Sequence, residues 1–335
     1  MRLSVLDQSP VHDDGSTVNA LHCSVELAQQ CEAWGYHRYW LAEHHDLTGF
    51  AGTCPEILIA HIADRTREIR VGSGGVMLSH YSPFKVAEQF RLLEALYPGR
   101  IDLGIGRAPG GDARAIAALA FPHEPASHDL YANQAQDLCR FLHGTMPADH
   151  AFETLRAMPD PERVPELWQL GSGGGSAEFA GSLGMGFALS LFIGNYQGPP
   201  EIVDHYRRAF HPSPSRHMPA TALAVTVVCA ESRAEARMIA ATQAYWRLQA
   251  YRYGRTTPLL APERCLQEVH DLASGDRAFF NELLDKVVFG TPAECRTELL
   301  RLAARYSAEE LIIVTVCHRF ADRLNSYRLL ADALQ

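Results

Sequence analysis

Short apolar runs alternate with longer helix-like segments along almost the whole chain, and this alternation constrains the fold more than any other feature. The runs have the length of buried strands, and the segments between them repeat apolar residues with a helical period. Strands are expected at Leu3–Leu6, Arg38–Ala42, Ile69–Leu78, Ile101–Ile105, Leu167–Leu170, Phe187–Phe192, Ala222–Cys229 and Glu310–Val316. Buried strands separated by helices form parallel sheets. Eight such units predict a closed α/β barrel, the (β/α)8 or TIM barrel.

An open, Rossmann-like sheet is the alternative that fits the same alternation. Two longer stretches, residues 109–130 and 251–290, interrupt the pattern, and the second is long enough for helices at Cys265–Ala273 and Phe279–Val288. Insertions that follow barrel strands extend the C-terminal face, where barrel sites are built. No linker composition is visible, and α/β barrels of this size form one unit, so residues 1–335 are expected to be a single domain.

The charge balance excludes several classes of partner. Lys and Arg total 30 and Asp and Glu total 39, so the formal net charge is −9. Broad binding to nucleic acid or to an anionic membrane needs a basic surface. No apolar run approaches the ~18–20 residues of a membrane span, and the N-terminus has no signal-peptide pattern. The eight cysteines form no C-x-x-C pair and are typical of reduced thiols, so we expect a cytoplasmic protein.

A histidine pair follows the second predicted strand, where residues 42–45 read Ala-Glu-His-His. Neighbouring residues on a strand point to opposite faces, so only one imidazole is expected to face the barrel mouth. An imidazole in that place titrates near neutral pH and is suited to proton transfer. The alternative is a solvated or hydrogen-bonded cap of the strand end. A metal site would need a third ligand, and Asp46 is poorly placed for it, so no metal is expected.

Glycines interrupt the third and fourth predicted strands. Residues 71–76 read Val-Gly-Ser-Gly-Gly-Val, and glycine inside a strand indicates a bulge or backbone pressed against a ligand. The fourth strand continues into Gly106 and Arg107. These small residues leave room, and the guanidinium group of Arg107 is suited to phosphate, with a surface salt bridge as the alternative. The glycine spacing here does not match the G-x-G-x-x-G dinucleotide fingerprint.

A third glycine-rich segment, residues 171–176, reads Gly-Ser-Gly-Gly-Gly-Ser and lies between a predicted strand and a predicted helix. Glycine-rich backbone can turn several N–H groups toward one anion, and the start of a helix adds its positive end. Ser172 and Ser176 add hydroxyl donors. No lysine follows, so this is not a nucleotide-triphosphate loop. The segment indicates a site for one phosphate monoester, and a plain flexible connection is the alternative.

Taken in order, these segments resemble the luciferase-like flavin monooxygenase family of bacterial oxidoreductases. The resemblance runs from residues 4–7 to the last strand. It is carried by Tyr-Trp-Leu-Ala-Glu-His-His at 39–45, by Val-Gly-Ser-Gly-Gly-Val-Met-Leu at 71–78, by the stretch 91–107, which ends Ile-Asp-Leu-Gly-Ile-Gly-Arg, and by the Gly-Thr-Pro turn at 290–292. The resemblance implies a (β/α)8 barrel that binds reduced flavin at the C-terminal ends of its strands.

The resemblance also implies roles for individual residues near the flavin ring. His44 matches a histidine that the luciferases use in proton handling, and it is our candidate catalytic residue. The Gly74–Gly75 bond matches the place where the family carries a non-prolyl cis peptide beside the ring. Ser73 and these two glycines are therefore candidate flavin-binding residues.

For the flavin phosphate, Arg107 matches an arginine that pairs with it in the family. Ser172, Gly173 and Ser176 match the phosphate-binding turn.

The function implied by the resemblance is an FMN-dependent, two-component monooxygenase. A separate flavin reductase would supply FMNH2, and the enzyme would use it with O2 on a small organic substrate. The alternatives are a deazaflavin (F420)-dependent dehydrogenase of the same barrel family and a non-catalytic flavin-binding paralogue. The luciferases carry a reactive cysteine where this chain has Gly106, and tryptophans where it has residues 190–192, so light emission is not expected.

The resemblance implies a homodimer as well. Luciferase-like barrels pair through helices on one side, for which Pro55–Ala63 and Pro83–Leu96 are the candidates. The substrate stays open, because it would be set by the loops 109–130, 192–200 and 251–290.

Overall fold

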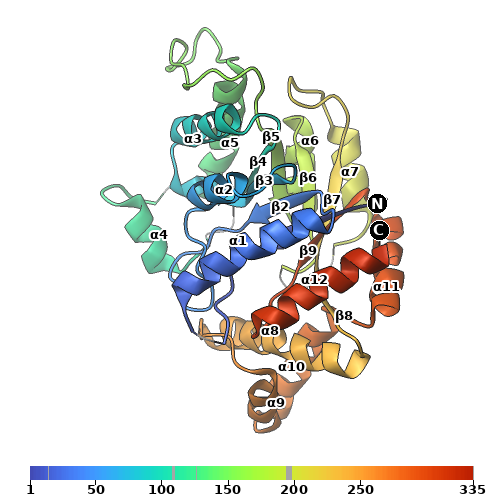
Figure 1. Cartoon of the computed structure of the whole chain (residues 1–335). Helices are drawn as coiled ribbons and strands as arrows, with labels where there is room; N and C mark the ends of the chain where they lie inside the picture. Colours follow the sequence, from blue (N-terminus) through green and yellow to red (C-terminus); the bar gives the residue numbers. More distant parts are fainter. Residues whose placement is uncertain (14, 108–109, 126, 194–197, 335) are drawn as a thin grey trace.

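Eight parallel strands close into a ring at the centre of the molecule (Figure 1). The computed structural model describes residues 1–13, 15–107, 110–125, 127–193 and 198–334. The strands pair in the order β6-β5-β4-β3-β2-β1-β9-β7, and β6 pairs with β7 to complete the ring. They are β1 (Arg2–Asp7), β2 (Arg38–Leu41), β3 (Arg70–Met77), β4 (Ile101–Gly106), β5 (Glu166–Gly171), β6 (Gly186–Ser190), β7 (Thr221–Cys229) and β9 (Glu310–Val314). The predicted (β/α)8 barrel is confirmed, and the open sheet is wrong.

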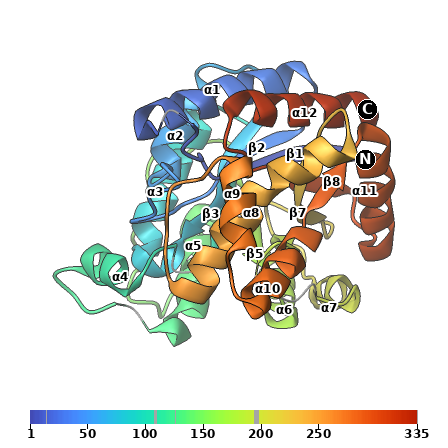
Figure 2. The same cartoon turned by 90° about the horizontal axis from the view of Figure 1, so that it is seen from below.

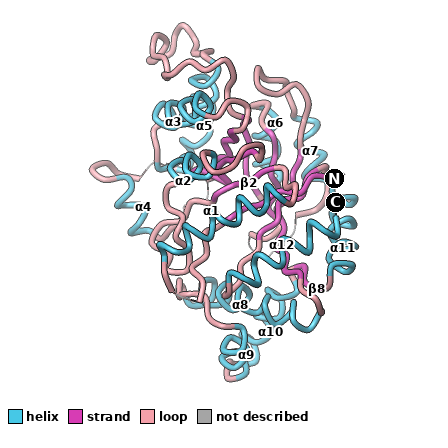
Figure 3. Tube along the Cα trace, viewed as in Figure 1, coloured by secondary structure: helices cyan, strands magenta, loops and turns pink. Residues whose placement is uncertain are grey.

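Helices surround the ring of strands on all sides (Figure 3). They are α1 (Thr17–Ala33), α2 (Pro55–Ala63), α3 (Pro83–Leu96), α4 (Ala113–Ala120), α5 (Tyr131–His143), α6 (Gly174–Ser182), α7 (Glu201–Ala209), α8 (Arg233–Tyr253), α9 (Pro262–His270), α10 (Ser274–Asp285), α11 (Pro292–Tyr306) and α12 (Phe320–Leu334). Proline stands in the first turn of α2, α3, α9 and α11, where its missing N–H breaks no helical hydrogen bond. The main hydrophobic core lies between the strands and the helices packed around them.

A ninth strand lies outside the ring. β8 (Val288–Gly290) pairs with the last residues of β7, Val227–Cys229. The predicted helix Phe279–Val288 is therefore too long at its C-terminal end, since α10 ends at Asp285. The apolar run that follows continues as a strand because β7 extends beyond the ring and offers it hydrogen-bond partners.

The alternation pattern does not predict α5, the barrel helix between β4 and β5. Its buried residues nevertheless recur with a helical period, from Tyr131 to Ala135, Leu138 and Leu142. The stretch predicted as an insertion at 109–130 contains α4 and the short 3-10 helix η2 (His128–Leu130). Pro109 and Ala126 of that stretch lie outside the described residues, as do residues 194–197 of the predicted substrate loop.

The two ends of the barrel are covered by different segments (Figures 1 and 2). The helices α8, α9 and α10 lie at the end where the carboxyl termini of the strands emerge, and they form a second hydrophobic cluster there. The long connection between α5 and β5, residues 144–165, lies at the opposite end. Helix α8 lies over the carboxyl-terminal end of the barrel, which Figure 2 faces.

A network of buried charges fills the amino-terminal end of the barrel interior. Arg38 on β2 donates to Glu310 and to Asp102, each at 2.7 Å. Arg70 on β3 donates to the other oxygen of Asp102 at 2.5 Å, and Ser4 on β1 donates to Glu310 at 2.6 Å. With Asp102 on β4 and Glu310 on β9, the network joins five neighbouring strands. Opposite charges compensate one another here, which an interior without water requires.

An apolar layer follows toward the carboxyl-terminal end. The rings of Trp40 and Trp168 meet edge to face at 5.4 Å, and the indole N–H of Trp40 donates to Asp102 at 2.9 Å. The layer also contains Leu6, Ala188, Ala222, Ala224, Ile312 and Val314. It separates the charged network from the cavity described below, so the barrel is closed at one end and open at the other.

Replacing Asp102 by asparagine keeps the size of the side chain and removes the charge that faces Arg38 and Arg70. Burial alone would raise the pKa of Asp102, but the two guanidinium groups outweigh it and hold the pKa below its ordinary value. We expect Asp102→Asn to lower the free energy of unfolding by about 3–5 kcal/mol at pH 7 in urea titrations. Because only the ionised carboxylate stabilises the fold, the difference should shrink as the pH falls below about 4.

The matched control is Asp64→Asn, because this carboxylate lies at the surface after α2 and is 70% exposed. It should change the free energy of unfolding by less than about 0.5 kcal/mol. Equal free energies for the wild type and Asp102→Asn at pH 7 would contradict the stabilising role given to the network.

Candidate active site at the carboxyl ends of the barrel strands

A cavity of about 400 Å³ opens at the carboxyl-terminal ends of the strands. Its walls are mostly apolar with a few polar groups, as is usual for small-molecule sites. The strand ends and the loops after them contribute Leu6, Gln8, Ala42, His44, Phe50, Gly74, Gly75, Met77, Gly106, Arg107, Gly110, Leu170, Gly171, Ser172, Ser176, Ser190, Phe192, Ile193 and Val316. Helix α8 contributes Gln243, Trp246, Arg247, Ala250 and Tyr251. Most of the predicted site residues therefore share one cavity.

Of the two histidines after β2, His44 lines the cavity. Its backbone N–H donates to Gly52 at 2.8 Å, and its ring lies 5.3 Å from that of Phe50. Its Nδ1 atom is buried and has no hydrogen-bond partner among the described residues. Burial lowers the pKa of His44 to about 4. The imidazole is therefore neutral at physiological pH and has a free ring nitrogen for a bound molecule.

The neighbouring histidine has a structural partner instead. His45 Nε2 lies 2.7 Å from a carboxylate oxygen of Glu43. Glu43 is buried and also accepts from the hydroxyl of Tyr81 at 2.6 Å and from the backbone N–H of Met77 at 2.9 Å. These bonds tie the end of β2 to the end of β3 and fix the position from which His44 projects.

The glycines of β3 form one side of the cavity. The Gly74–Gly75 peptide bond is cis, and the register with β4 shifts between Gly74 and Val76. Side chains cannot replace these hydrogens: a Cβ on Gly75 would lie 2.8 Å from the carbonyl oxygen of Gly104, and one on Gly74 would lie 2.6 Å from Leu6. Glycine at these positions thus lets β3 pack closely against its neighbours, and the bare backbone of both residues lines the cavity.

Ser73 does not line the cavity, although it was predicted as part of the flavin-binding segment. Its side chain is fully buried, donates to the carbonyl oxygen of Gly104 at 2.8 Å and accepts from the N–H of the same residue at 3.1 Å. The hydroxyl group therefore joins β3 to β4 beneath the glycines.

Arg107, Ser172 and Ser176 also line this cavity. The guanidinium group of Arg107 lies 5.9 Å from the ring centre of Tyr131, whose hydroxyl donates to Gln169 at 2.8 Å. Ser172 belongs to the turn between β5 and α6, and Ser176 belongs to the first turn of α6. An arginine, two hydroxyls and the N–H groups at the start of a helix form a donor set suited to phosphate.

The two glycines Gly171 and Gly173 differ in their surroundings. A Cβ on Gly171 would collide with the side chain of Ser176, so the turn can close only around glycine. Gly173 is the N-cap residue of α6, and a Cβ there would meet no atom within 4 Å. The backbone at Gly173 therefore borders open space, which a phosphate group can occupy, although this residue is not part of the cavity wall itself.

The cavity face of α8 was not predicted from the sequence. Gln243, Trp246, Arg247 and Ala250 follow one another at helical spacing and lie on one face of the helix. The signal that could have found them is the pair of polar residues, Gln243 and Arg247, one turn apart in an otherwise alanine-rich, apolar stretch. Such a pair on a buried helix face points to a polar partner.

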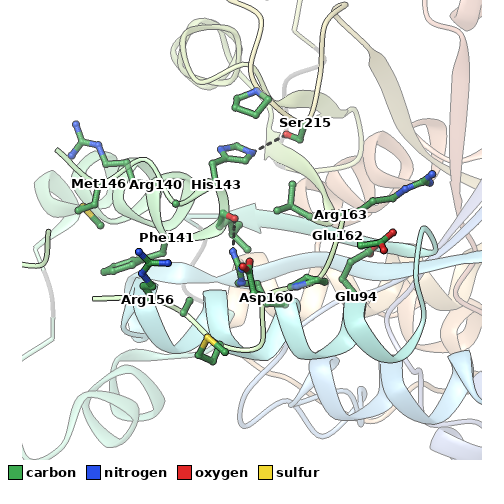
Figure 4. A pocket seen from close by; sticks show the side chains of 18 of the residues that line it. Glu94, Arg140, Phe141, His143, Met146, Arg156, Asp160, Glu162, Arg163 and Ser215 are labelled. Atoms are coloured by element: carbon green, nitrogen blue, oxygen red, sulfur yellow. Dashed lines mark hydrogen bonds and ion pairs between the residues drawn. The ribbon is translucent and has the colours of Figure 1, made fainter. Parts of the chain in front are cut away.

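A larger cavity, of about 970 Å³, lies at the opposite end of the barrel (Figure 4). Its polar groups bond mainly to one another. Arg91 donates to the carbonyl oxygens of Pro159 and Leu142, each at 2.7 Å, and pairs with Asp160. His143 Nε2 lies 3.2 Å from the hydroxyl of Ser215. These contacts anchor the loop 144–165, and we assign this cavity no chemistry.

Among the described residues, no group of three His, Cys, Asp or Glu side chains is arranged to hold a metal ion. Within the same part of the chain, none of the helices has the length and apolar character needed to cross a bilayer.

Comparison with known proteins decides the family. The model of the luciferase-like monooxygenase family matches residues 1–308. The chain belongs to this family. The resemblance inferred from the ordered motifs is thereby confirmed, and the protein is placed among monooxygenases.

Similar proteins cover the chain from end to end. An N-acetyl-S-alkylcysteine monooxygenase of Bacillus subtilis (strain 168) is 35% identical over 341 residues, 100% of this chain and 98% of the relative. A luciferase-like monooxygenase of Escherichia coli (strain K12) is 33% identical over 337 residues, 98% of this chain and 96% of the relative. The crystal structure of apo-MsnO8 has a TM-score of 0.88 at 40% identity, covering 99% of this chain and 98% of that chain.

More distant structures share the fold. The oxygenating constituent of 3,6-diketocamphane monooxygenase from Pseudomonas putida, in complex with FMN, has a TM-score of 0.71 at 17% identity, over 99% of this chain and 96% of that chain. An F420-dependent secondary alcohol dehydrogenase has a TM-score of 0.70 at 14% identity, over 100% and 99%. At these identities the likeness establishes the barrel and does not choose between the two cofactors.

His44 should titrate near pH 4 in the protein without ligand, because its ring is buried. Proton-detected 1H–15N NMR of the imidazole groups measures this directly, and His44→Gln assigns the signal by removing it. The unfolded chain takes up the proton near pH 6.5, so the contribution of His44 to stability is complete above that pH and declines as the pH falls toward 4. A His44 pKa near 6.5 would contradict the burial of its ring.

Proposed function

We propose that this protein is an FMN-dependent, two-component monooxygenase: a separate flavin reductase supplies reduced FMN, and the barrel uses it with O2 to oxidise a small organic substrate. The observation that carries the proposal is the cavity at the strand ends, which is lined by donors suited to an anion, by bare glycine backbone and by a neutral histidine. Membership of the luciferase-like monooxygenase family supports the class of reaction.

We assign Arg107, Ser172 and Ser176 to the binding of the FMN phosphate. A guanidinium fork and hydroxyl donors suit a phosphate dianion, and the first turn of α6 adds backbone N–H groups next to Gly173. The Gly74–Gly75 surface is assigned to the flat ring. Ser73 supports this surface from below through its bonds to the neighbouring strand.

Flavin, when bound, supplies the electrons and the reaction with O2. The residues of the chain bind it, orient it and exclude water, for which the cavity has apolar walls at Leu6, Phe50 and Phe192. His44 is assigned to acid–base work, because its neutral ring can accept or hold a proton at Nδ1, the atom without a protein partner. The cysteine of the luciferases is absent at Gly106, so we expect oxidation without light emission.

An F420-dependent dehydrogenase and a flavin-binding protein without turnover are the alternatives. The monooxygenase relatives share about a third of their residues with the chain along its full length, whereas the F420-dependent neighbours share 12–14%. His44, which lines the cavity and whose Nδ1 atom has no hydrogen-bond partner among the described residues, favours turnover over binding alone. The identities thus support a monooxygenase, and the histidine supports turnover.

We also place the protein in the cytoplasm, on redox grounds. All eight cysteines are free thiols, and seven of them are buried. Reduced, buried thiols are typical of proteins in a reducing compartment.

At the proposed phosphate site, we expect Arg107→Ala to weaken FMN binding about 10–100-fold. This is the loss in affinity that follows from removing charge-assisted hydrogen bonds worth about 1.5–3 kcal/mol. Quenching of FMN fluorescence or titration calorimetry measures the affinity. The matched control is Arg114→Ala, an exposed arginine of α4 outside the cavity, which should leave the affinity unchanged. Unchanged affinity for Arg107→Ala would remove this residue from the phosphate site.

Rapid mixing of the reduced FMN complex with oxygenated buffer tests the reaction class. The monooxygenase predicts that protein-bound flavin is oxidised with a time course different from that of free reduced flavin. An identical time course would support binding without turnover. Tight binding of F420, with hydride transfer and no uptake of O2, would support the dehydrogenase instead.

We further propose that two copies of the chain pair through α2 and α3. Large apolar side chains on these helices face solvent: Ile57 is 68% exposed, Leu92 51% and Leu96 59%. Exposed apolar residues gathered on neighbouring helices are typical of subunit interfaces.

Sedimentation velocity tests the pairing. The wild type should sediment as a dimer, and Ile57→Lys should shift it toward monomer because a charge would enter the interface. The matched control is Met218→Lys, because Met218 is 73% exposed and lies outside α2 and α3. A monomeric wild type at micromolar concentration would contradict the proposal.

A further inference from the structure

One buried arginine in the cavity wall has no opposite charge beside it. Arg247 on α8 is 4% exposed, and no ion pair of the described residues includes it. Its Nη1 atom has no hydrogen-bond partner among those residues. The ring centre of Tyr251 lies 6.0 Å from the guanidinium carbon of Arg247. A buried cation without a counter-charge is costly, and this cost is removed when an anion binds next to it.

The other buried arginines in the described part of the chain form ion pairs with carboxylates. Arg38 pairs with Asp102 and Glu310, Arg323 pairs with Asp7 at 2.5 Å, and Arg91 pairs with Asp160.

The pKa values of the paired arginines and of Arg247 shift in opposite directions. Nearby carboxylates raise the pKa of Arg38 and of Arg323 above the ordinary value despite burial. Burial lowers the pKa of Arg247, which the hydroxyl of Tyr251 only partly offsets. The difference follows from the lack of a carboxylate beside Arg247 among the described residues.

Gln243 stands one helical turn before Arg247 on the same face of α8. It is 5% exposed, and its side-chain oxygen Oε1 has no hydrogen-bond partner among the described residues. A buried amide oxygen usually accepts a hydrogen bond, so this one is open to a donor from a bound molecule. The two side chains together offer a cationic donor and a neutral acceptor to one bound molecule.

Aromatic side chains connect this polar pair with the catalytic candidate. Trp246, between Gln243 and Arg247 in the sequence, lies 4.9 Å from the ring of Phe50, and Phe50 lies 5.3 Å from the ring of His44. All of these residues line the same cavity. An apolar group that lies along these rings would extend from the polar pair toward His44.

The flavin phosphate does not explain the pair, because it has its own donor set. That set comes from the segments after β4 and β5, whereas α8 follows β7 and meets the loop after β2 through Trp246 and Phe50. The donors assigned to the phosphate and the polar pair therefore come from different elements of the cavity wall. The first set suits the phosphate, and the polar pair lies on the side of the cavity that includes Phe50 and, next to it, His44.

We propose that Arg247 and Gln243 form the substrate-recognition site, and that the substrate is an apolar molecule with a carboxylate group for Arg247 and an adjacent N–H donor for Gln243. The proposal rests on the proposed function insofar as the bound molecule is the one oxidised. An N-acylated amino acid with an apolar side chain has this chemistry.

The test is titration calorimetry with a matched pair of probes, N-acetyl-L-leucine and its neutral analogue N-acetyl-L-leucinamide. The protein is titrated both with saturating FMN and without FMN. The wild type should bind the carboxylate at least about 10-fold more tightly than the amide. Arg247→Gln should abolish this preference, whereas the affinity for FMN should change less than 2-fold. The matched control, Arg252→Gln, concerns an exposed arginine on the same helix and should keep the preference.

Several outcomes would overturn the proposal. Equal binding of the two probes by the wild type, or no binding of either, would do so. A loss of FMN affinity in Arg247→Gln with the probe preference intact would assign the arginine to the flavin phosphate. If Arg247→Gln does not fold by circular dichroism, Arg247→Lys keeps the charge and Gln243→Leu removes only the acceptor. The first should keep the carboxylate preference, and the second should weaken both probes alike.

Failure of the proposed function would look different. In that case the wild type would not bind FMN, while the probe preference without FMN would still report on Arg247.

Discussion

Arg38, at the amino-terminal end of the barrel interior, makes the contacts on which the rest of the structure depends. Its guanidinium group lies between Asp102 and Glu310, 2.7 Å from an oxygen of each. Because breaking a buried ion pair leaves an unpaired charge in the interior, the strands that carry these residues keep their register only together. With this end closed by charges and by the tryptophan layer, the other end is free to carry glycines and an open cavity. Stability and chemistry therefore occupy opposite ends of the same strands.

The polar groups of the cavity wall differ from those of the charged network beneath it in how they are paired. In the network at the amino-terminal end, Arg38, Arg70, Asp102 and Glu310 pair with one another, whereas in the described cavity wall Arg247 has no ion pair and the Nδ1 atom of His44 has no hydrogen-bond partner. Unsatisfied polar groups in a native protein are expected where a ligand completes them. A chain with a net charge of −9 thus keeps two cationic groups, Arg107 and Arg247, in the wall of its cavity, where we propose that they bind anionic groups.

The fold was predictable because alternation and parallel pairing leave few topologies, and the residues at strand ends were predictable because barrel geometry brings those ends together. This reasoning predicted that His44, Arg107, Ser172 and Ser176 lie together, and they line one cavity. It did not predict that the hydroxyl of Ser73 bonds to the neighbouring strand, because that bond depends on cross-strand register. It also missed the face of α8, since the sequence does not specify which way an inserted helix crosses the barrel mouth.

The position of the phosphate in a crystal structure of the protein with FMN tests this account most directly. The account predicts the phosphate between Arg107 and the turn Ser172–Ser176, with the flavin ring against Gly74–Gly75 and Arg247 not in contact with the phosphate. A phosphate bound to Arg247, with Arg107 facing solvent, would contradict it, because the two anion positions would then have been assigned the wrong way round.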